Sequence, residues 1–171
     1  MRKIETYKSE HNIPDGDWIF GWGYDESQLT EKRHLNKMEI DSVLPNNPVY
    51  LVHTSGHMGV ANSMALEKMK VTAATENPEG GSIARLPNSK EPSGLVQETA
   101  MYPFVGNMLK ILESKQAEFF DATQEKYAMN GITTAQDGMT DRNAIQFFQS
   151  QADAGKLKID LIALPGFSEL E

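Results

Sequence analysis

The last third of the chain alternates between helix-like and strand-like segments, and this alternation constrains the fold most. Residues 103–130 have helical spacing with a change of phase near Ser114, which predicts two consecutive helices. Strands are predicted over 132–136 and 157–164, with a helix over 141–155 between them. Because strands separated by helices pair in parallel, we expect an α/β fold with functional groups at the carboxyl ends of its strands.

The earlier part of the chain begins with strand signals and then becomes irregular. Aromatic residues over 18–25 and apolar residues over 49–52 predict two short strands. The apolar spacing over 58–69 predicts a helix. Residues 77–94 are rich in Gly, Pro, Ser and Asn, which predicts a loop or irregular hairpin with a short strand over 82–85.

Charge and composition exclude several classes of protein. The formal net charge is -8, and an acidic surface repels phosphate backbones, so we expect no nucleic-acid partner. The absence of cysteine excludes disulfides, thiolate ligands and a cysteine nucleophile. No apolar run approaches the roughly 20 residues of a membrane helix, and no apolar stretch of a signal peptide follows the first residues. We therefore expect a cytoplasmic protein with no membrane partner.

The densest group of chemically active side chains is His53-Thr54-Ser55-Gly56-His57, directly after a predicted strand. Ser55-Gly56 separates the histidines and no Glu follows His53, so the zincin pattern is absent and a metal site from these two alone is not expected. We interpret the stretch as a strand-to-helix loop. There His57 can donate a hydrogen bond or a proton to a ligand near neutral pH. A capping histidine bonded to its neighbours is the alternative.

Two carboxylates also stand out by position. Asp137 follows a predicted strand, where α/β folds carry functional groups. The alternative is that Asp137-Gly138 is simply a turn. Glu98 follows Gly94-Leu95-Val96-Gln97 and is a candidate metal ligand or acid–base group. The alternative is a glutamate that only favours a helix dipole.

Six segments, taken in order, resemble amidohydrolase family 3, a branch of the metal-dependent amidohydrolase superfamily. They are residues 21–25, 45–51, 55–57 with 60–66, 77–85, 92–98 and 130–137. Together they cover most of residues 18–137. Some members of this family carry the label of exoenzyme regulatory protein.

The resemblance implies a distorted (β/α)8 TIM barrel with a small β domain, and hydrolysis of C–N bonds by metal-activated water. Metal sites of this family need a His-x-His pair on the first barrel strand, which this sequence lacks. We therefore expect residues 1–171 to form a single domain, an internal segment of a longer hydrolase. A divalent metal, zinc above all, is expected in the whole protein. No metal and no activity are expected in this segment alone.

The resemblance also implies roles for particular residues. It places His57 and Asp137 in catalysis and makes Glu98 a candidate metal ligand. The positions implied to line or support the pocket for a small-molecule substrate are Trp22, Tyr24, Asn62 and Arg85. Because a segment of a closed barrel must expose sheet edges, we expect the isolated chain to self-associate. A second interpretation remains open, a non-catalytic ligand-binding or regulatory module derived from the same fold.

Overall fold

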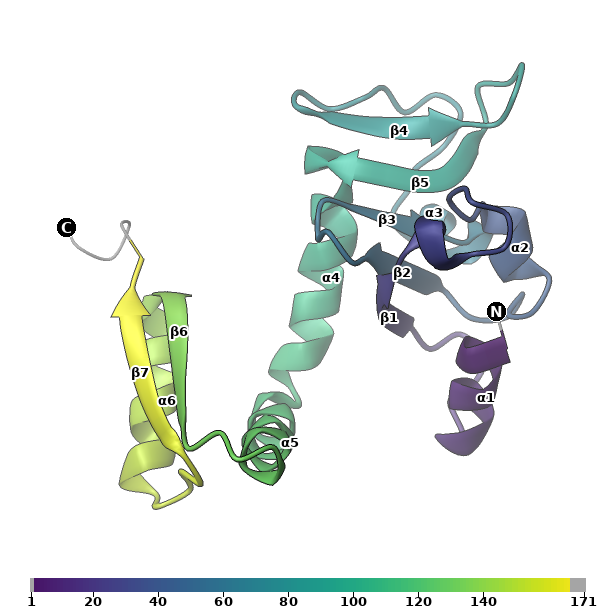
Figure 1. Ribbon diagram of the computed structural model, residues 1–171. Helices are drawn as coiled ribbons and strands as arrows, with labels where there is room; N and C mark the ends of the chain where they lie inside the picture. The colour runs from purple at the N-terminus through teal and green to yellow at the C-terminus, as the bar shows by residue number, and fades with distance from the viewer. Residues whose placement is uncertain (1, 167–171) are drawn as a thin grey trace. The chain divides into compact units, whose positions relative to one another are not determined.

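The chain divides into two units, Met1–Lys110 and Ile111–Glu171. The computed structural model describes residues 2–166 (Figure 1). The first unit is built on a five-stranded sheet and the second on a two-stranded sheet. That residues 1–171 belong to one domain of a longer protein stays a prediction.

The five-stranded sheet has the strand order β1-β2-β3-β5-β4. Its strands are β1 (Ile19–Tyr24), β2 (Val49–His53), β3 (Met58–Ala61), β4 (Gly81–Arg85) and β5 (Pro92–Glu98). β1 and β2 pair in parallel, as an α/β fold requires. The pairs β2–β3, β3–β5 and β4–β5 are antiparallel, which corrects the expectation of parallel strands alternating with helices. The physical reason is loop length, since residues 54–57 are too few for a parallel crossover.

Short helices flank this sheet. They are α1 (Arg2–Glu10), η1 (Glu26–Gln28), α2 (Lys37–Asp41), α3 (Ser63–Lys68), η2 (Thr99–Met101) and α4 (Tyr102–Glu113). The prediction of one helix over 58–69 is wrong, because β3 occupies its first third. Asn62 caps α3, so this helix begins only at Ser63. Gly59 lies against the ring of Tyr50, where a Cβ would come within 2.5 Å of Cζ, so the strand needs a glycine there.

β2 is buried along its whole length and carries a hydrophobic cluster on each face. Alternate strand residues point to opposite faces. Accordingly, Tyr50 and Val52 belong to one cluster, with Phe104 of α4, while Val49 and Leu51 belong to the other. The rings of Tyr50 and Phe104 stack with their centroids 4.9 Å apart. This contact fastens the start of α4 to the sheet.

The second unit contains the predicted helix, strand, helix and strand. Its elements are α5 (Gln116–Met129), β6 (Thr134–Thr140), α6 (Arg142–Asp153) and β7 (Asp160–Pro165). β6 and β7 pair in parallel, and the break between α4 and α5 falls where the apolar phase changes. Asp141 caps α6 by accepting a hydrogen bond from the Ala144 amide at 2.8 Å. The β–α–β arrangement predicted for this part is confirmed.

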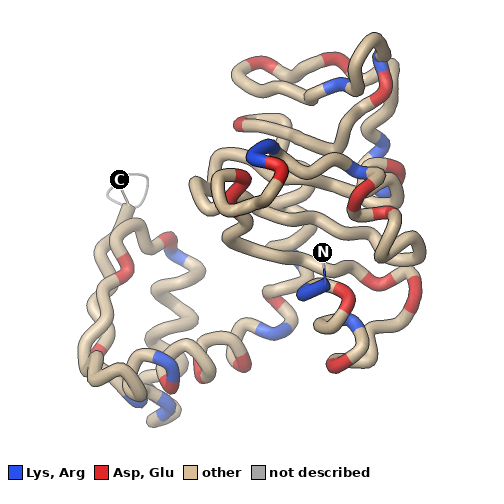
Figure 2. The backbone as a smooth tube through the Cα atoms, turned by 45° about the vertical axis from the view of Figure 1, so that its right-hand side comes forward, with Lys and Arg blue, Asp and Glu red and all other residues tan. Residues whose placement is uncertain are grey.

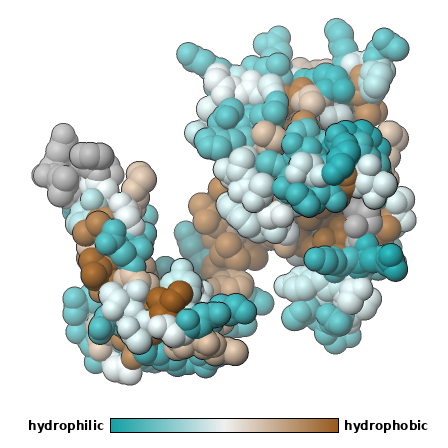
Figure 3. All heavy atoms as spheres, viewed as in Figure 1, coloured by the Kyte–Doolittle hydropathy of each residue, from teal (hydrophilic) through white to brown (hydrophobic). Residues whose placement is uncertain are grey.

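The surface of the second unit is partly apolar, while charged residues are spread over both units (Figures 2 and 3). Several large apolar side chains of β6 and β7 are exposed, among them Met139, Ile162 and Leu164. In the described part of the chain this sheet has only two strands, so each strand has an unpaired edge. No helix among residues 2–166 is long and apolar enough to cross a membrane.

Candidate functional site

His57 and Glu98 meet where β3 begins and β5 ends. Nδ1 of His57 lies 3.2 Å from Oε2 of Glu98. The backbone sets this contact, because the Glu98 amide donates to the His57 carbonyl at 2.9 Å and Met58 pairs with Gln97. Both side chains are more than half exposed, so a ligand can reach them. Two residues singled out by sequence are thus brought together.

Glu98 has an unusual backbone, with φ 51° and ψ -128°. A residue other than glycine in such a region costs about 1–3 kcal/mol, and strain of this kind clusters at functional sites. Gly81 lies opposite, where a Cβ would come within 2.5 Å of the Ala100 nitrogen, so its missing side chain leaves room for the turn. The strained turn ends β5 and aims the Glu98 carboxylate at the imidazole. The imidazole is held by one nitrogen, and its Nε2 has no partner among residues 2–166.

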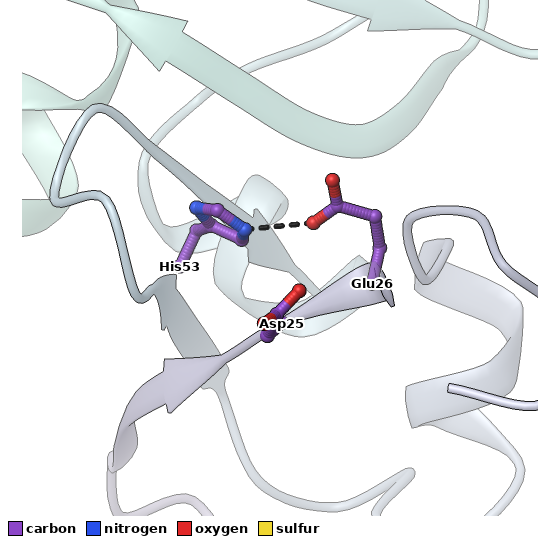
Figure 4. A group of neighbouring side chains, drawn as sticks. All are labelled: Asp25, Glu26 and His53. Carbon is purple, nitrogen blue, oxygen red and sulfur yellow. Dashed lines mark ion pairs between the residues drawn. The ribbon is translucent and has the colours of Figure 1, made fainter. Parts of the chain in front are cut away.

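A second group of polar side chains gathers at the carboxyl ends of β1 and β2 (Figure 4). It consists of Asp25, Glu26 and His53, each of which offers one ligand atom, and these atoms all lie within 4.8 Å of one another. Nε2 of His53 is 2.7 Å from Oε2 of Glu26. The parallel pairing of the two strands puts Tyr24 opposite His53, which brings the residues after Tyr24 to the imidazole.

Hydrogen bonds hold the two carboxylates of this group ionised. Backbone hydrogen bonding lowers the pKa of Glu26, helped by His53, against a smaller opposing effect of burial. Ser27 lowers the pKa of Asp25 through its hydroxyl and its amide. Burial raises the pKa of Tyr24, and the neighbouring charge of Glu26 adds to this. At neutral pH the group therefore presents two anionic ligands beside an imidazole.

Two of the four predicted substrate-binding residues lie near these groups. Trp22 is 69% exposed on β1, and its ring lies within contact distance of the Gly56 position. The Tyr24 ring packs edge-on against His53, with centroids 5.2 Å apart, and its hydroxyl lies 3.2 Å from Nδ1 of His34. These positions are compatible with a role beside a ligand, which stays a prediction.

The other two predicted substrate-binding residues hold the fold together. Asn62 is fully buried, and its side chain makes four hydrogen bonds, accepting from the amides of Val49 and Ala65 and donating to the carbonyls of Leu44 and Asn47. Both polar atoms of the Asn62 side chain are therefore engaged within the fold, and a role in supporting a substrate pocket stays a prediction. The Arg85 guanidinium donates to the carbonyls of Thr72, Thr75 and Lys90, which fixes the loops beside β4.

Asp137 lies in the second unit. The strand predicted over 132–136 extends in the structure to Thr140, so Asp137 is inside β6, opposite Ala163, rather than at the end of the strand. The strand pairing becomes irregular directly after it, between Asp137 and Thr140. A catalytic role for Asp137 stays a prediction.

Sequence reasoning missed the group formed by Asp25, Glu26 and His53. The signal was present, since Asp25 ends the first predicted strand, Glu26 follows it and His53 directly follows the second. Parallel pairing of those strands brings their carboxyl ends to one edge. The two strands were predicted separately, and His53 was considered only together with His57, four residues on.

The model of the amidohydrolase family matches residues 1–171. Over 158 residues the chain is 30% identical to an N-substituted formamide deformylase of Arthrobacter pascens, covering 91% of this chain and 29% of that protein. It is 36% identical to the protein LONG AFTER FAR-RED 3 of Arabidopsis thaliana over 158 residues, 85% of this chain and 26% of that one. The chain thus spans less than a third of the length of these relatives.

The structure is similar to that of an uncharacterized metal-dependent hydrolase from Pyrococcus horikoshii. The TM-score is 0.56 at 19% sequence identity, and the match covers 95% of this chain and 31% of the other. The shared fold is therefore that of part of a metal-dependent hydrolase. With the family match over its full length, the chain belongs to the amidohydrolase family.

Proposed function

We propose that this chain is an internal segment of a metal-dependent amidohydrolase that hydrolyses C–N bonds of small molecules, and that the segment alone is inactive. Family membership supports hydrolase chemistry. The similarity to an N-substituted formamide deformylase supports an N-substituted amide as the substrate class. The chain covers less than a third of the length of these relatives, which supports a catalytic centre that is completed by residues outside the chain.

The parallel strand pairs support a barrel as the fold of the whole protein. β1 with β2, and β6 with β7, each pair as neighbouring strands of a (β/α)8 barrel do. In this proposal the antiparallel strands β3, β4 and β5 form an insertion after β2. The end of β5 lies beside the start of β3, which follows the carboxyl end of β2. This arrangement places Glu98 beside His57, and active sites of such barrels lie at the carboxyl ends of the strands.

The observation that carries the proposal is the His57–Glu98 contact. A carboxylate within hydrogen-bonding distance of one ring nitrogen fixes the orientation of an imidazole, and Nε2 of His57 is then the ring atom proposed to exchange a proton with a ligand. The strained backbone of Glu98 supports a functional reason for this contact. The leaving amine of a C–N bond needs a proton, and His57 is the group proposed to deliver it.

A divalent metal, with zinc as the proposed ion, supplies Lewis acidity that polarises an amide carbonyl and activates water. A catalytic zinc needs about three protein ligands of imidazole or carboxylate type. Glu98 has the right chemistry for one of them and is exposed. The other ligands at that centre would come from outside this chain.

The test is turnover by the whole protein that contains this chain. The proposal predicts hydrolysis of N-substituted formamides, loss of turnover after a chelator removes metal, and recovery with added zinc. Esters of matched structure test whether the C–N bond is required. The 171-residue chain, assayed in the same way, tests whether residues outside it are required for turnover. Saturable binding of these amides by metal-loaded whole protein without any turnover would contradict the proposal and favour a non-catalytic module.

A further inference from the structure

We propose that Asp25, Glu26 and His53 form a second site for a divalent transition metal, and that the first unit holds it without residues from elsewhere. This inference goes beyond the proposed hydrolase function and does not rest on it. The ligand set differs from the His57–Glu98 pair, and no role in turnover is assigned to it. It revises the expectation that this segment alone binds no metal.

The chemistry of the three side chains fits zinc or a similar ion. One imidazole nitrogen and two carboxylate oxygens are ligands that zinc accepts, at about 2.0–2.2 Å each. Ligand atoms around a tetrahedral ion are then about 3.4 Å apart. The three atoms lie within 4.8 Å of one another, so small rotations of side chains would bring them to an ion.

The hydrogen bonding of His53 and Glu26 is a further observation that supports a metal ion at this position. His53 is only 8% exposed, and its Nε2 is aimed at the Glu26 carboxylate (Figure 4). The two atoms are 2.7 Å apart, yet neither makes a hydrogen bond of normal geometry with any residue from 2 to 166. Buried polar atoms are nearly always satisfied, by protein, by water or by an ion. If side-chain rotation moved the two atoms from 2.7 Å to about 3.4 Å apart, one bound cation would satisfy both of them.

Ser55 lies beside Nδ1 of His53, the ring nitrogen that faces away from Glu26. Its position suits a residue that orients His53 as a metal ligand. A histidine that binds a metal through Nε2 carries its proton on Nδ1 and donates it to a neighbouring oxygen. Oγ of Ser55 lies 2.8 Å from Nδ1 and can accept that proton. The amide of Ser55 lies 3.0 Å from the same nitrogen and donates to it in the other tautomer. Ser55 is thus a positioning residue that supports His53 with or without the metal.

The test is metal binding by the purified chain, measured by zinc competition with a chelating dye and by the visible absorption of bound cobalt. We expect one equivalent to bind. Glu26→Gln and Asp25→Asn keep the shapes of the side chains and should each weaken binding at least about tenfold. Ser55→Ala should weaken it by about 10- to 100-fold, as losses of outer partners of metal ligands do. Circular dichroism checks that each variant is folded.

His57→Ala and His11→Ala are the matched controls and should bind as the parent chain does. His11 lies just after α1 and is exposed. The absence of binding, or unchanged binding in Glu26→Gln and Asp25→Asn, would overturn this inference. So would loss of binding in His57→Ala, because the ion would then sit at the His57–Glu98 pair. Turnover is not measured, so failure here leaves the proposed hydrolase function standing.

Discussion

His57 and Glu98 are 41 residues apart in the chain, yet Nδ1 of one lies 3.2 Å from Oε2 of the other. The antiparallel pairing of β3 with β5 creates this contact, because it sets the start of one strand beside the end of the other. The pair is exposed, and the backbone of Glu98 is strained. Because the contact depends on the register of β3 and β5, substitutions that disturb the packing or hydrogen bonding of the sheet should also disturb the contact.

Asn62→Ala tests the structural role of Asn62. The substitution removes four hydrogen bonds and the cap of α3, and it leaves the buried amides of Val49 and Ala65 without their acceptor. Each of these two buried groups left unpaired costs about 1–3 kcal/mol, so the free energy of unfolding should fall by at least about 2 kcal/mol. Urea unfolding of the chain measures this. Asn46→Ala is the control, since Asn46 is exposed and its side chain bonds, among the described residues, only to Asp15. A fall below about 1 kcal/mol in Asn62→Ala would contradict the structural role.

Tyr50→Phe tests the core. The hydroxyl of Tyr50 is buried and has no hydrogen-bond partner among the described residues. Burial of an unpaired hydroxyl costs roughly 1–3 kcal/mol, so its removal should leave the free energy of unfolding unchanged or higher. Tyr24→Phe, which loses a contact to His34, should instead lower it by about 0.5–1.5 kcal/mol. A clear loss of stability in Tyr50→Phe would mean that the hydroxyl has a partner.

Self-association of the isolated chain is the third prediction. β6 and β7 form a two-stranded sheet with exposed apolar side chains, and such a sheet is marginal in water unless something covers it. Light scattering at micromolar concentration should show a mass above the 19.0 kDa of one chain. Ile162→Lys places a charge on β7, where Ile162 is 46% exposed, and should return the chain toward a monomer. A monomeric parent chain would refute this prediction.

Local patterns in the sequence were enough to predict most of the second unit. Helical spacing, the phase change near Ser114 and the Asp141 cap all act within a few residues, and the structure confirms them. The helix predicted over 58–69 failed because Gly59 and Val60 are recruited into a sheet by strands far along the chain. Apolar spacing over so short a stretch does not distinguish strand from helix.

The candidate site was predictable only in part, because its contacts also join strands that are far apart in the chain. His57 and Glu98 were singled out separately, by chain position and by family resemblance, but their contact depends on strand register. The group of Asp25, Glu26 and His53 depends on the parallel pairing of β1 with β2. The sequence did not distinguish lining a pocket from supporting it at Asn62, because a polar side chain in a family motif can bond to backbone groups as well as to a substrate.

A double-mutant cycle on the whole protein tests the central claim most directly, with turnover of an N-substituted formamide as the readout. Loss of a positioned proton donor costs about 100-fold or more, so His57→Ala and Glu98→Gln should each lower kcat by about that factor. Because the two residues share one contact, the double variant should be little worse than the more impaired of the two single variants. His11→Ala, at an exposed position, should keep normal turnover. Normal turnover in both single variants, or losses that simply multiply in the double variant, would contradict the claim that His57 and Glu98 work as a pair in this hydrolase.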